Sequence, residues 1–220
     1  MKIIDLSLEM RNRLDVPPSQ ARPITIEKVH RYPGHWQATW CSISAHTASH
    51  VDSPLHVVAG AKTIGEIPLE KVIGEAVILD LTHKGKANIE ITLEDVQKFD
   101  KEIKAGDIVI LRTDWGKKAF GTADYYDKSP HLSPEAARWL ADKNPRTICF
   151  DFFEEYNARS KDFKPDDFVV HKIILGKGII IVEGLTNLDQ LSRKRVKFFA
   201  APLKIMDSEA APTRIFAIED

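Results

Sequence analysis

The sequence has little cysteine, almost no net charge and no long apolar run. Its 220 residues include two cysteines, Cys41 and Cys149, which are far apart and have apolar neighbours. We therefore expect buried free thiols in a reducing compartment rather than a disulfide or a cysteine-based zinc site. The 31 Lys and Arg nearly balance the 32 Asp and Glu. That balance excludes a protein that binds nucleic acid or anionic membranes by bulk electrostatics.

No segment approaches the roughly 20 consecutive apolar residues of a membrane span. The first ten residues carry Asp5 and Glu9 and lack the apolar stretch of a signal peptide. We therefore expect a cytoplasmic protein. Hydrophobic residues make up 43% of the chain and charged residues 29%, a composition typical of a globular protein. This length buries an ample core, and we expect one domain over residues 1–220.

Short runs rich in Ile, Val and Phe recur along the chain and predict buried strands, because Gly, Pro, Asn or Lys bound each run. A further strand is expected at Thr25–His30, after a proline-rich loop at Val16–Ile24. The other predicted strands are Ala76–Leu81, Asp107–Thr113, Thr147–Phe153, Gly178–Leu185, Lys197–Leu203 and Arg214–Ile218.

Two helices have clear start signals. Thr92 followed by Asp95 resembles a capping box and predicts a helix over Thr92–Phe99. Ser133 followed by Pro134 suits an N-cap and first turn, and predicts a helix over Pro134–Lys143. Since strands outnumber helices, the sequence predicts a mixed α/β fold.

The segment Cys41–Val57 reads CSISAHTASHVDSPLHV and collects four polar donors at even positions: His46, His50, Asp52 and His56. In an extended chain these side chains point to one side. A helix would place two of the histidines one turn apart, but Thr, Ala, Ser and Pro disfavour it. A straight strand also fails, because ten residues at about 3.3 Å separate the outer histidines by roughly 33 Å. We therefore expect a strand that ends in a turn-rich loop.

Imidazole and carboxylate donors without a thiolate suit Zn²⁺ or Mn²⁺ in an open site that also holds water. We therefore expect a divalent metal cofactor, one or two ions per chain, and Asp52 is able to bridge two ions. Further donors must come from elsewhere. His171 and Glu183 are candidates, since a carboxylate at the end of an apolar run is costly to bury unless it is paired. Asp80 and Asp151 hold similar positions, and spacing alone does not choose among these carboxylates.

The segment from His46 to His56 resembles the H-x-G-T-H-x-D-x-P-x-H signature of the metal-dependent cyclase/hydrolase family, which includes bacterial kynurenine formamidases and isatin hydrolase. The resemblance extends through most of the chain. Leu111–Thr113 resembles the family's strand-end Leu-Arg-Thr, and Asp207–Arg214 resembles its C-terminal segment. His171 and Glu183 match its distal pair of metal ligands.

The resemblance implies specific roles for these residues. The implied metal ligands are His46, His50, Asp52, His171 and Glu183, and His56 would be the catalytic proton-transfer residue. The implied fold is a swivelling β/β/α-type α/β domain with a β-barrel-like core, assembled as a homodimer or larger homo-oligomer.

Three departures from the family pattern stand out. Ala48-Ser49 replaces the Gly-Thr of the signature. Tyr32–His35 is the nearest counterpart of a Trp-Pro-Gly-Asp segment that helps to cover an aromatic substrate. Asp151–Asn157 replaces an Asp-x-x-Ser-x-Asp pattern. The expected metal ligands are therefore present while the expected substrate walls differ.

These features predict a metal-dependent hydrolase that cleaves an amide, cyclic amide or related acyl bond of a small molecule with metal-activated water. Two alternatives stay open: a cyclase or lyase that stabilises an enolate, and a non-catalytic metal-binding relative. The expected substrate contacts, for which plain core packing is the alternative, are Trp115, Phe152, Phe153, Tyr156 and His35.

Overall fold

The computed structural model describes residues 1–12, 14 and 24–219. The predicted loop at 16–24 therefore lies outside the described residues except for Ile24, which is buried. The strands are β1 Lys2–Asp5, β2 Thr25–Arg31, β3 Trp36–Ser42, β4 His50–Asp52, β5 Ile73–Asp80, β6 Glu90–Ile91, β7 Ile108–Arg112, β8 His131–Leu132, β9 Thr147–Phe150, β10 Ile180–Glu183, β11 Arg195–Phe199, β12 Ala210–Pro212 and β13 Phe216–Glu219.

Five α-helices occur in this part of the chain: α1 Leu93–Gln97, α2 Trp115–Ala119, α3 Asp124–Asp127, α4 Pro134–Asp142 and α5 Val169–Leu175. Short 3₁₀ helices join them: η1 Pro54–His56, η2 Ile64–Glu66, η3 Leu69–Lys71, η4 Thr82–Lys84, η5 Asn157–Arg159, η6 Pro165–Asp167 and η7 Leu188–Gln190. The start signals explain two helices. Asp95 accepts hydrogen bonds from the Thr92 amide and hydroxyl, and the Ser133 hydroxyl accepts one from the Ala136 amide.

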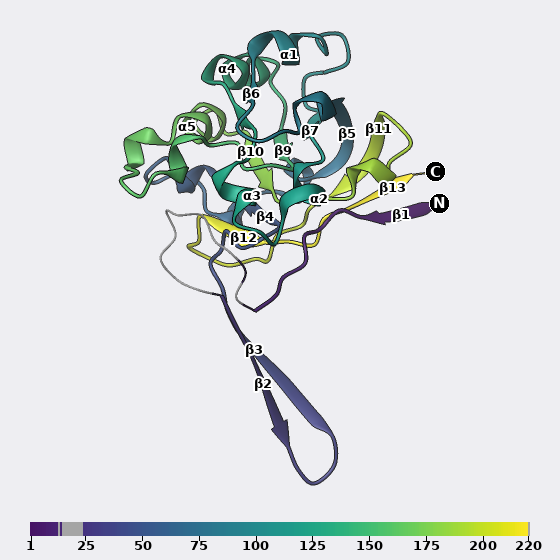
Figure 1. Cartoon of the computed structure of the whole chain (residues 1–220), viewed down its shortest axis with the longest axis vertical. Coiled ribbons are helices and arrows are strands. Elements are labelled where there is room, and N and C mark those ends of the chain that lie inside the picture. The colour runs from purple at the N-terminus through teal and green to yellow at the C-terminus, as the bar shows by residue number, and fades with distance from the viewer. Residues whose placement is uncertain (13, 15–23, 220) are drawn as a thin grey trace.

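One mixed sheet organises the molecule, in the order β1-β13-β11-β5-β7-β9-β10-β4-β12. The four central strands β5, β7, β9 and β10 are parallel, and the outer strands pair antiparallel. Helices α1, α4 and α5 lie on one side of this sheet (Figure 1). The sheet curls into a half-barrel, so the predicted α/β class with a barrel-like core is confirmed.

The central strands are apolar on both faces, which is why they read as continuous hydrophobic runs. On β7, Val109 and Leu111 face the helices, while Ile108 and Ile110 face the inside of the curl. There they meet residues of the outer strands, including Phe198 of β11. Each of the six predicted apolar runs overlaps a strand, and each strand is shorter than or shifted from its run by a few residues.

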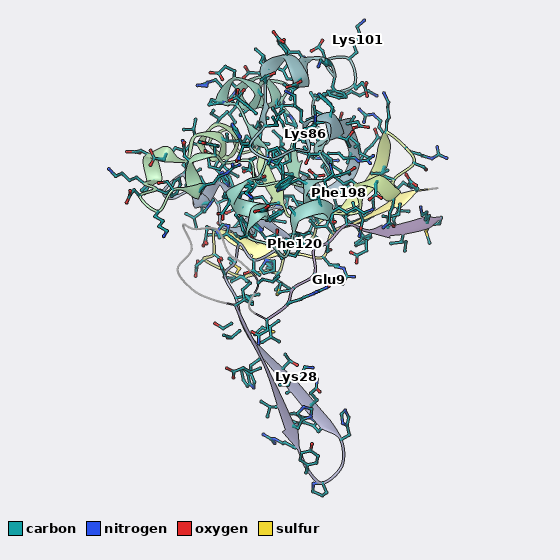
Figure 2. All side chains as sticks on the ribbon, in the orientation of Figure 1. Glu9, Lys28, Lys86, Lys101, Phe120 and Phe198 are labelled. Atoms are coloured by element: carbon teal, nitrogen blue, oxygen red, sulfur yellow. The ribbon has the colours of Figure 1, made fainter. Side chains whose placement is uncertain are left out.

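Strands β2 and β3 form a hairpin that projects from the rest of the molecule (Figure 1). We call this hairpin, residues 25–42, the arm. Its side chains point into solvent on both faces, as around Lys28 in Figure 2. The register places Val29 opposite Ala38 and Trp36 opposite Arg31, so these residues share one face with Trp40. The arm is therefore amphipathic, with its aromatic face uncovered in one chain.

Candidate metal centre

The signature segment folds as two strands separated by a tight turn. Strand β3 ends at Ser42, a turn follows through Ser49, and β4 begins at His50. Ala48 has φ 54°, in the left-handed region that glycine enters at no steric cost. The expected alternation therefore holds only within β4, where His50 and Asp52 share a face, and the turn supplies the bend that brings His46 back toward them.

A hydroxyl at the next position fastens this turn. Ser49 donates a hydrogen bond to the Gly184 carbonyl at 2.6 Å and accepts one from the Leu8 amide at 2.8 Å. Gly184 has φ +75°, and a Cβ there would lie 2.4 Å from the Ala48 carbonyl oxygen. The two segments therefore touch backbone to backbone, which explains a hydroxyl residue in the signature and a glycine after Glu183.

Sheet register brings the distal acid to the same place. Strand β10 pairs antiparallel with β4, with Glu183 opposite His50 and Ile181 opposite Asp52. Glu183 is the last residue of β10, at the carboxyl edge of the parallel strands, where open α/β sheets commonly bind ligands. The other two candidate acids do not converge here. Asp80 accepts hydrogen bonds from Thr82, and Asp151 accepts them from Thr113 and from the Asp114 amide.

Helix α5 contributes His171, and Glu155 fixes its position. One Glu155 carboxylate oxygen accepts hydrogen bonds from the Val170 amide at 2.8 Å and the His171 amide at 3.2 Å. The same oxygen lies 3.4 Å from His171 Nδ1 and accepts a hydrogen bond from it. The carboxylate thereby satisfies orphan donors of the helix start and holds the imidazole ring in one orientation.

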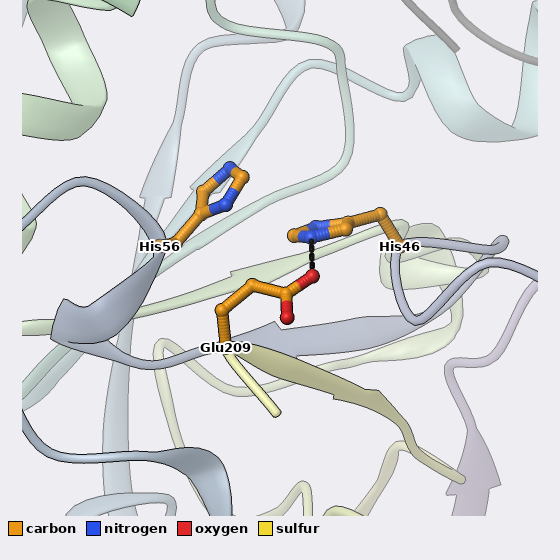
Figure 3. A group of neighbouring side chains, drawn as sticks. All are labelled: His46, His56 and Glu209. Carbon is orange, nitrogen blue, oxygen red and sulfur yellow. Dashed lines mark hydrogen bonds and ion pairs between the residues drawn. The ribbon is translucent and has the colours of Figure 1, made fainter. Parts of the chain in front are cut away.

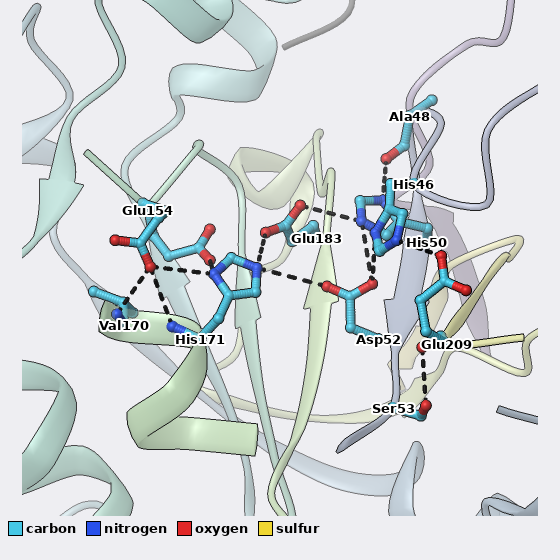
Figure 4. Close-up of polar contacts among 11 residues, drawn as sticks. His46, Ala48, His50, Asp52, Ser53, Glu154, Val170, His171, Glu183 and Glu209 are labelled. Carbon is cyan, nitrogen blue, oxygen red and sulfur yellow. Dashed lines mark hydrogen bonds and ion pairs between the residues drawn. The ribbon is translucent and has the colours of Figure 1, made fainter. Parts of the chain in front are cut away.

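The three imidazoles share one arrangement, shown in Figure 4. Each ring donates from one nitrogen to an outer oxygen: His46 Nε2 to Glu209 at 3.0 Å, His50 Nδ1 to the Ala48 carbonyl at 2.9 Å, and His171 Nδ1 to Glu155. A carbonyl oxygen only accepts, so His50 carries its proton on Nδ1. The other nitrogen of each ring faces Asp52 or Glu183, which is how metal-binding histidines are usually oriented.

Asp52 lies between two sets of donors. Its Oδ1 is 3.0 Å from His46 Nδ1 and 3.5 Å from His50 Nε2, while its Oδ2 is 3.7 Å from His171 Nε2. Glu183 also faces both sides, with Oε2 3.1 Å from His50 Nε2 and Oε1 3.4 Å from His171 Nε2. Each of the two carboxylates is thus positioned to bridge the His50 side and the His171 side of the site.

The carboxylates of the site stabilise the protonated, positively charged form of the three histidines. Burial lowers the pKa of His46, but Asp52 and Glu209 outweigh burial and raise that pKa to about 10. Burial likewise lowers the pKa of His50 and of His171, yet their carboxylate neighbours raise both above the ordinary value. Burial raises the pKa of Asp52, and the two adjacent histidines bring it well below its usual range. Without a metal, protons on the three imidazoles therefore supply the positive charge that the carboxylates stabilise.

The donor set fits a divalent ion. Buried atoms without a hydrogen-bond partner are concentrated here: His50 Nε2, both oxygens of Asp52, both of Glu154 and Oε1 of Glu183. Orphaned polar atoms in a folded protein are costly unless an ion or water satisfies them. Four groups of three donors have ligand atoms within 4.8 Å of one another. Two exclude His56, namely His46 with His50 and Asp52, and Glu154 with His171 and Glu183. The other two include it, namely His56 with His46 and Glu209, and His56 with Asp52 and His171.

His56 stands apart from the other three histidines. It ends the short helix η1, and its ring lies 4.3 Å from the His46 ring and 5.5 Å from the His171 ring, centroid to centroid. Figure 3 shows Glu209 bonded to the His46 ring and the His56 ring beside them without a bond of its own. Burial lowers the pKa of His56 to about 4, so the ring is neutral at pH 7.

A pocket of about 220 Å³ opens beside these groups. Metal-binding candidates form one side of it, and aromatic residues form the other. The residues that line it are Ser44, His46, Ala48, His50, His56, Tyr125, Tyr126, Phe153, Ala158, Phe168, His171, Glu183 and Gly184. This volume is below the roughly 300–1,000 Å³ of pockets for drug-sized ligands, so it suits a molecule of one or two rings.

Of the expected substrate contacts, only Phe153 lines this pocket. Trp115 and Phe152 are buried in the core, where Trp115 donates from Nε1 to the Tyr125 carbonyl. Tyr156 is 54% exposed and packs on His131 outside the pocket. His35 lies in the exposed turn between β2 and β3, at the tip of the arm, and is not among the residues that line the pocket.

Sequence reasoning also missed six residues at the site. Tyr125, Tyr126 and Phe168 belong to the aromatic wall, and Glu154, Glu155 and Glu209 surround the histidines. Two acids directly after an apolar strand were a usable signal, because such a position is costly for charge. No such signal in the sequence pointed to Glu209. It reaches His46 because Ser53 donates two hydrogen bonds to the Glu209 backbone carbonyl.

The comparisons with known proteins agree with this geometry. A sequence model of the family described as "Putative cyclase" matches residues 4–154, more than half of the chain. The chain belongs to this cyclase family. Isatin hydrolase of Roseibium aggregatum is 24% identical over 93% of this chain and 86% of its own length. Kynurenine formamidase of Salinibacter ruber is 28% identical over 78% of this chain and 75% of its own length.

Solved structures of cyclase-family proteins superpose well on this chain. Isatin hydrolase A from Labrenzia aggregata, bound to benzyl benzoate, gives a TM-score of 0.81 with 26% identity, covering 98% of this chain and 93% of its own. A potential metal-dependent hydrolase with cyclase activity gives 0.77 with 27% identity, covering 100% and 99%. The resemblance stated from the sequence is confirmed, and with it the expected class, a metal-dependent hydrolase of the cyclase family. Among the described residues, none of the helices has the length and apolarity to cross a membrane.

Proposed function

We propose that this chain hydrolyses an amide, cyclic amide or related acyl bond of a small aromatic substrate, with divalent metal as cofactor. The observation that carries the proposal is the common orientation of three imidazoles, each with one nitrogen bonded outward and the other directed at Asp52 or Glu183. The proposed ligands are His46, His50, Asp52, His171 and Glu183.

The metal would supply Lewis-acid activation of water and of the scissile carbonyl. Asp52 turns one oxygen toward His46 and His50 and the other toward His171, which supports two ions rather than one. Nitrogen and carboxylate ligands without thiolate suit zinc or manganese. The carboxylate share of the set favours manganese of the two.

His56 is the proposed proton-transfer residue. It lines the pocket and is neutral at pH 7, so its ring can accept the proton of the attacking water. It then returns that proton to the leaving nitrogen. Phe168 lies 5.2 Å from the His56 ring and 4.5 Å from the His171 ring, and its packing restricts where the imidazole can turn.

The pocket wall supports an aromatic substrate. Tyr125, Tyr126 and Phe153 form a chain of edge-to-face contacts with ring centroids 4.8 and 5.4 Å apart. A planar ring can lie against this wall with its carbonyl directed at the histidines. Named relatives that act on such compounds, isatin hydrolase and kynurenine formamidase, support formamides of anilines and fused lactams as first candidates.

The decisive experiment is metal analysis of the native protein followed by assay of metal-loaded and metal-free protein against N-formyl anilines, isatin, cyclic imides and lactones. We expect turnover of at least one compound that is lost on chelation and restored by Zn²⁺ or Mn²⁺. Reaction in ¹⁸O-water must place label in the acid product. Turnover without label would favour a cyclase or lyase, and turnover that survives complete metal removal would refute metal-dependent hydrolysis.

The arm supports a homodimer. Its exposed aromatic face includes Trp36, 48% exposed, and Trp40, 70% exposed, and a two-stranded hairpin is marginal on its own in water. In a symmetric pair each arm packs on the other chain, which covers both apolar faces. Both cysteines are free thiols; Cys149 is buried as expected, whereas Cys41 is exposed on the arm, contrary to the expectation of a buried thiol. Two free thiols support a reducing location such as the cytoplasm.

A further inference from the structure

Glu154 has no role in the mechanism above, yet it is fully buried beside the proposed metal ligands. It follows β9 and is 0% exposed, and neither of its carboxylate oxygens has a hydrogen-bond partner. Its neighbour Glu155 is also buried, and one of its carboxylate oxygens accepts hydrogen bonds from two backbone amides and the His171 ring. Glu154 is therefore an unsatisfied carboxylate aimed into the site, which is costly unless a cation accepts it.

The surroundings of Glu154 indicate that this cation is a bound metal ion. Glu154, His171 and Glu183 each place a ligand atom within 4.8 Å of the other two. One Glu154 oxygen lies 3.3 Å from His171 Nδ1, the ring nitrogen that faces away from Asp52 and Glu183, so the other Glu154 oxygen is the one left for an ion bound at His171 Nε2. Spacings of this size are those between neighbouring ligands of one metal ion, whose bonds to oxygen and nitrogen are about 2.0–2.2 Å. Figure 4 shows Glu154 beside His171, with His46 toward the other end of the group.

We propose that Glu154 is a further ligand of the divalent ion held by His171 and Glu183. This proposal rests on the proposed function and deepens it. It adds a third carboxylate to Asp52 and Glu183, so two divalent ions and a hydroxide would be balanced in a buried site. Carboxylate oxygen is a hard ligand, so this position has harder ligands than a histidine-rich zinc site. It therefore favours Mn²⁺ over Zn²⁺.

The test replaces Glu154 without changing its shape. Metal-free Glu154→Gln and wild-type proteins are titrated with Mn²⁺, with bound ions counted by calorimetry and free ions by electron paramagnetic resonance. We expect one ion to bind at least ten-fold more weakly in the variant, while the ion at His46 and His50 keeps its affinity. Changing a carboxylate that only supports a ligand also costs about 10–100-fold in metal affinity, so a crystal structure decides whether Glu154 itself binds the ion.

Glu219→Gln is the matched control. Glu219 is also buried and accepts hydrogen bonds from Ser192 and Arg193, but it lies on β13, apart from the site. Neutralising it should leave Mn²⁺ binding unchanged. Equal stoichiometry and affinity in Glu154→Gln and wild type would overturn the proposal.

A crystal structure of wild-type protein loaded with Mn²⁺ gives a second measurement that does not depend on the folding of the variant. An anomalous peak with a Glu154 oxygen about 2.0–2.6 Å away supports the assignment. A peak between His171 and Glu183 with Glu154 more than about 3.5 Å away refutes it. If wild-type protein binds no divalent ion, the proposed function itself fails. If it binds ions and Glu154→Gln binds them equally, only this inference fails.

Discussion

At the residue scale, the site depends on which nitrogen of each histidine is free. His50 is the clearest case, because the Ala48 carbonyl claims its Nδ1 proton and leaves Nε2 for Asp52 and Glu183. Glu209 and Glu155 do the same for His46 and His171. Three outer oxygen acceptors thus prepare three ligand nitrogens, and each acceptor comes from a different part of the chain.

His56→Ala should keep its metal and lose turnover. General acid–base catalysis is worth about 10²–10⁴ in rate, so we expect kcat to fall by that factor. Metal content by elemental analysis, with kcat on the best substrate, measures both quantities. His83→Ala, an exposed histidine outside the pocket, is the control and should match wild type in both. Loss of metal in step with activity would make His56 a ligand.

Metal binding should release protons at pH 7. The pKa of His46 is raised to about 10, and those of His50 and His171 are raised too, so the metal-free rings carry protons that an ion must displace. Apparent affinity should therefore rise with pH, about ten-fold per unit for each proton released. Calorimetry at pH 7 in two buffers of different ionisation enthalpy counts these protons. Identical heats in both buffers would contradict the prediction.

The sequence indicates which histidines and carboxylates gather at the candidate site better than it indicates what surrounds them. Their even spacing, and their resemblance to a known signature, point to His46, His50 and Asp52 before any fold is known. Spacing could not choose Glu183 over Asp80 and Asp151, because the choice depends on which strand pairs with β4. Spacing also does not choose the aromatic residues of the pocket wall, because residues near the site in sequence, such as Phe152, turn into the core.

At the element scale, the turn between β3 and β4 is the critical piece. It rests on the backbone of Gly184, and its left-handed Ala48 directs a carbonyl at His50. The sequence predicted a bend, since a straight strand could not gather the histidines. It gave no position for the bend, because alanine is a poor indicator of positive φ.

Gly184→Ala should disrupt the site and destabilise the fold. A Cβ there would lie 2.4 Å from the Ala48 carbonyl oxygen, a backbone atom that cannot move aside alone. Positive-φ strain and overpacking together should cost roughly 2–4 kcal/mol. Urea unfolding and Mn²⁺ affinity measure the two effects, and both should fall.

Gly178→Ala separates strain from contact. Its φ of +72° nearly matches that of Gly184, but no other group lies within 4 Å of the place that its Cβ would take. It should cost about 1–2 kcal/mol from conformation alone and keep wild-type metal affinity. Equal losses of metal affinity in both variants would show that the close approach to Ala48 is unimportant.

At the scale of the whole molecule, the fold class was accessible from the sequence and the topology was not. Six apolar runs mark six strands of the sheet, and the cap signals mark α1 and α4. The order of strands depends on long-range pairing, which local patterns do not encode. The arm was also hidden, because only Thr25–His30 was expected as a strand, and of its partner β3 only Cys41 and Ser42 fall in the segment that was expected to be extended.

Trp40→Lys should convert a dimer to monomers. Trp40 lies on the apolar face of the arm with Trp36 and Val29, and a charge there opposes burial against a second chain. Sedimentation velocity at micromolar concentration measures the change. Lys28→Ala, on the opposite face of the same hairpin, should remain dimeric. A wild-type protein that sediments as a monomer would refute the dimer.

The pairing of β4 with β10 has a consequence for how the protein matures. It joins residue 50 to residue 183, and Glu209 lies later still. During synthesis, the early histidines leave the ribosome long before their distant companions exist. A metal ion that binds at that stage would find an incomplete set of ligands, so we expect metal binding to wait until the whole polypeptide has been released. Only full-length molecules would then bind metal, and a truncated product would bind none.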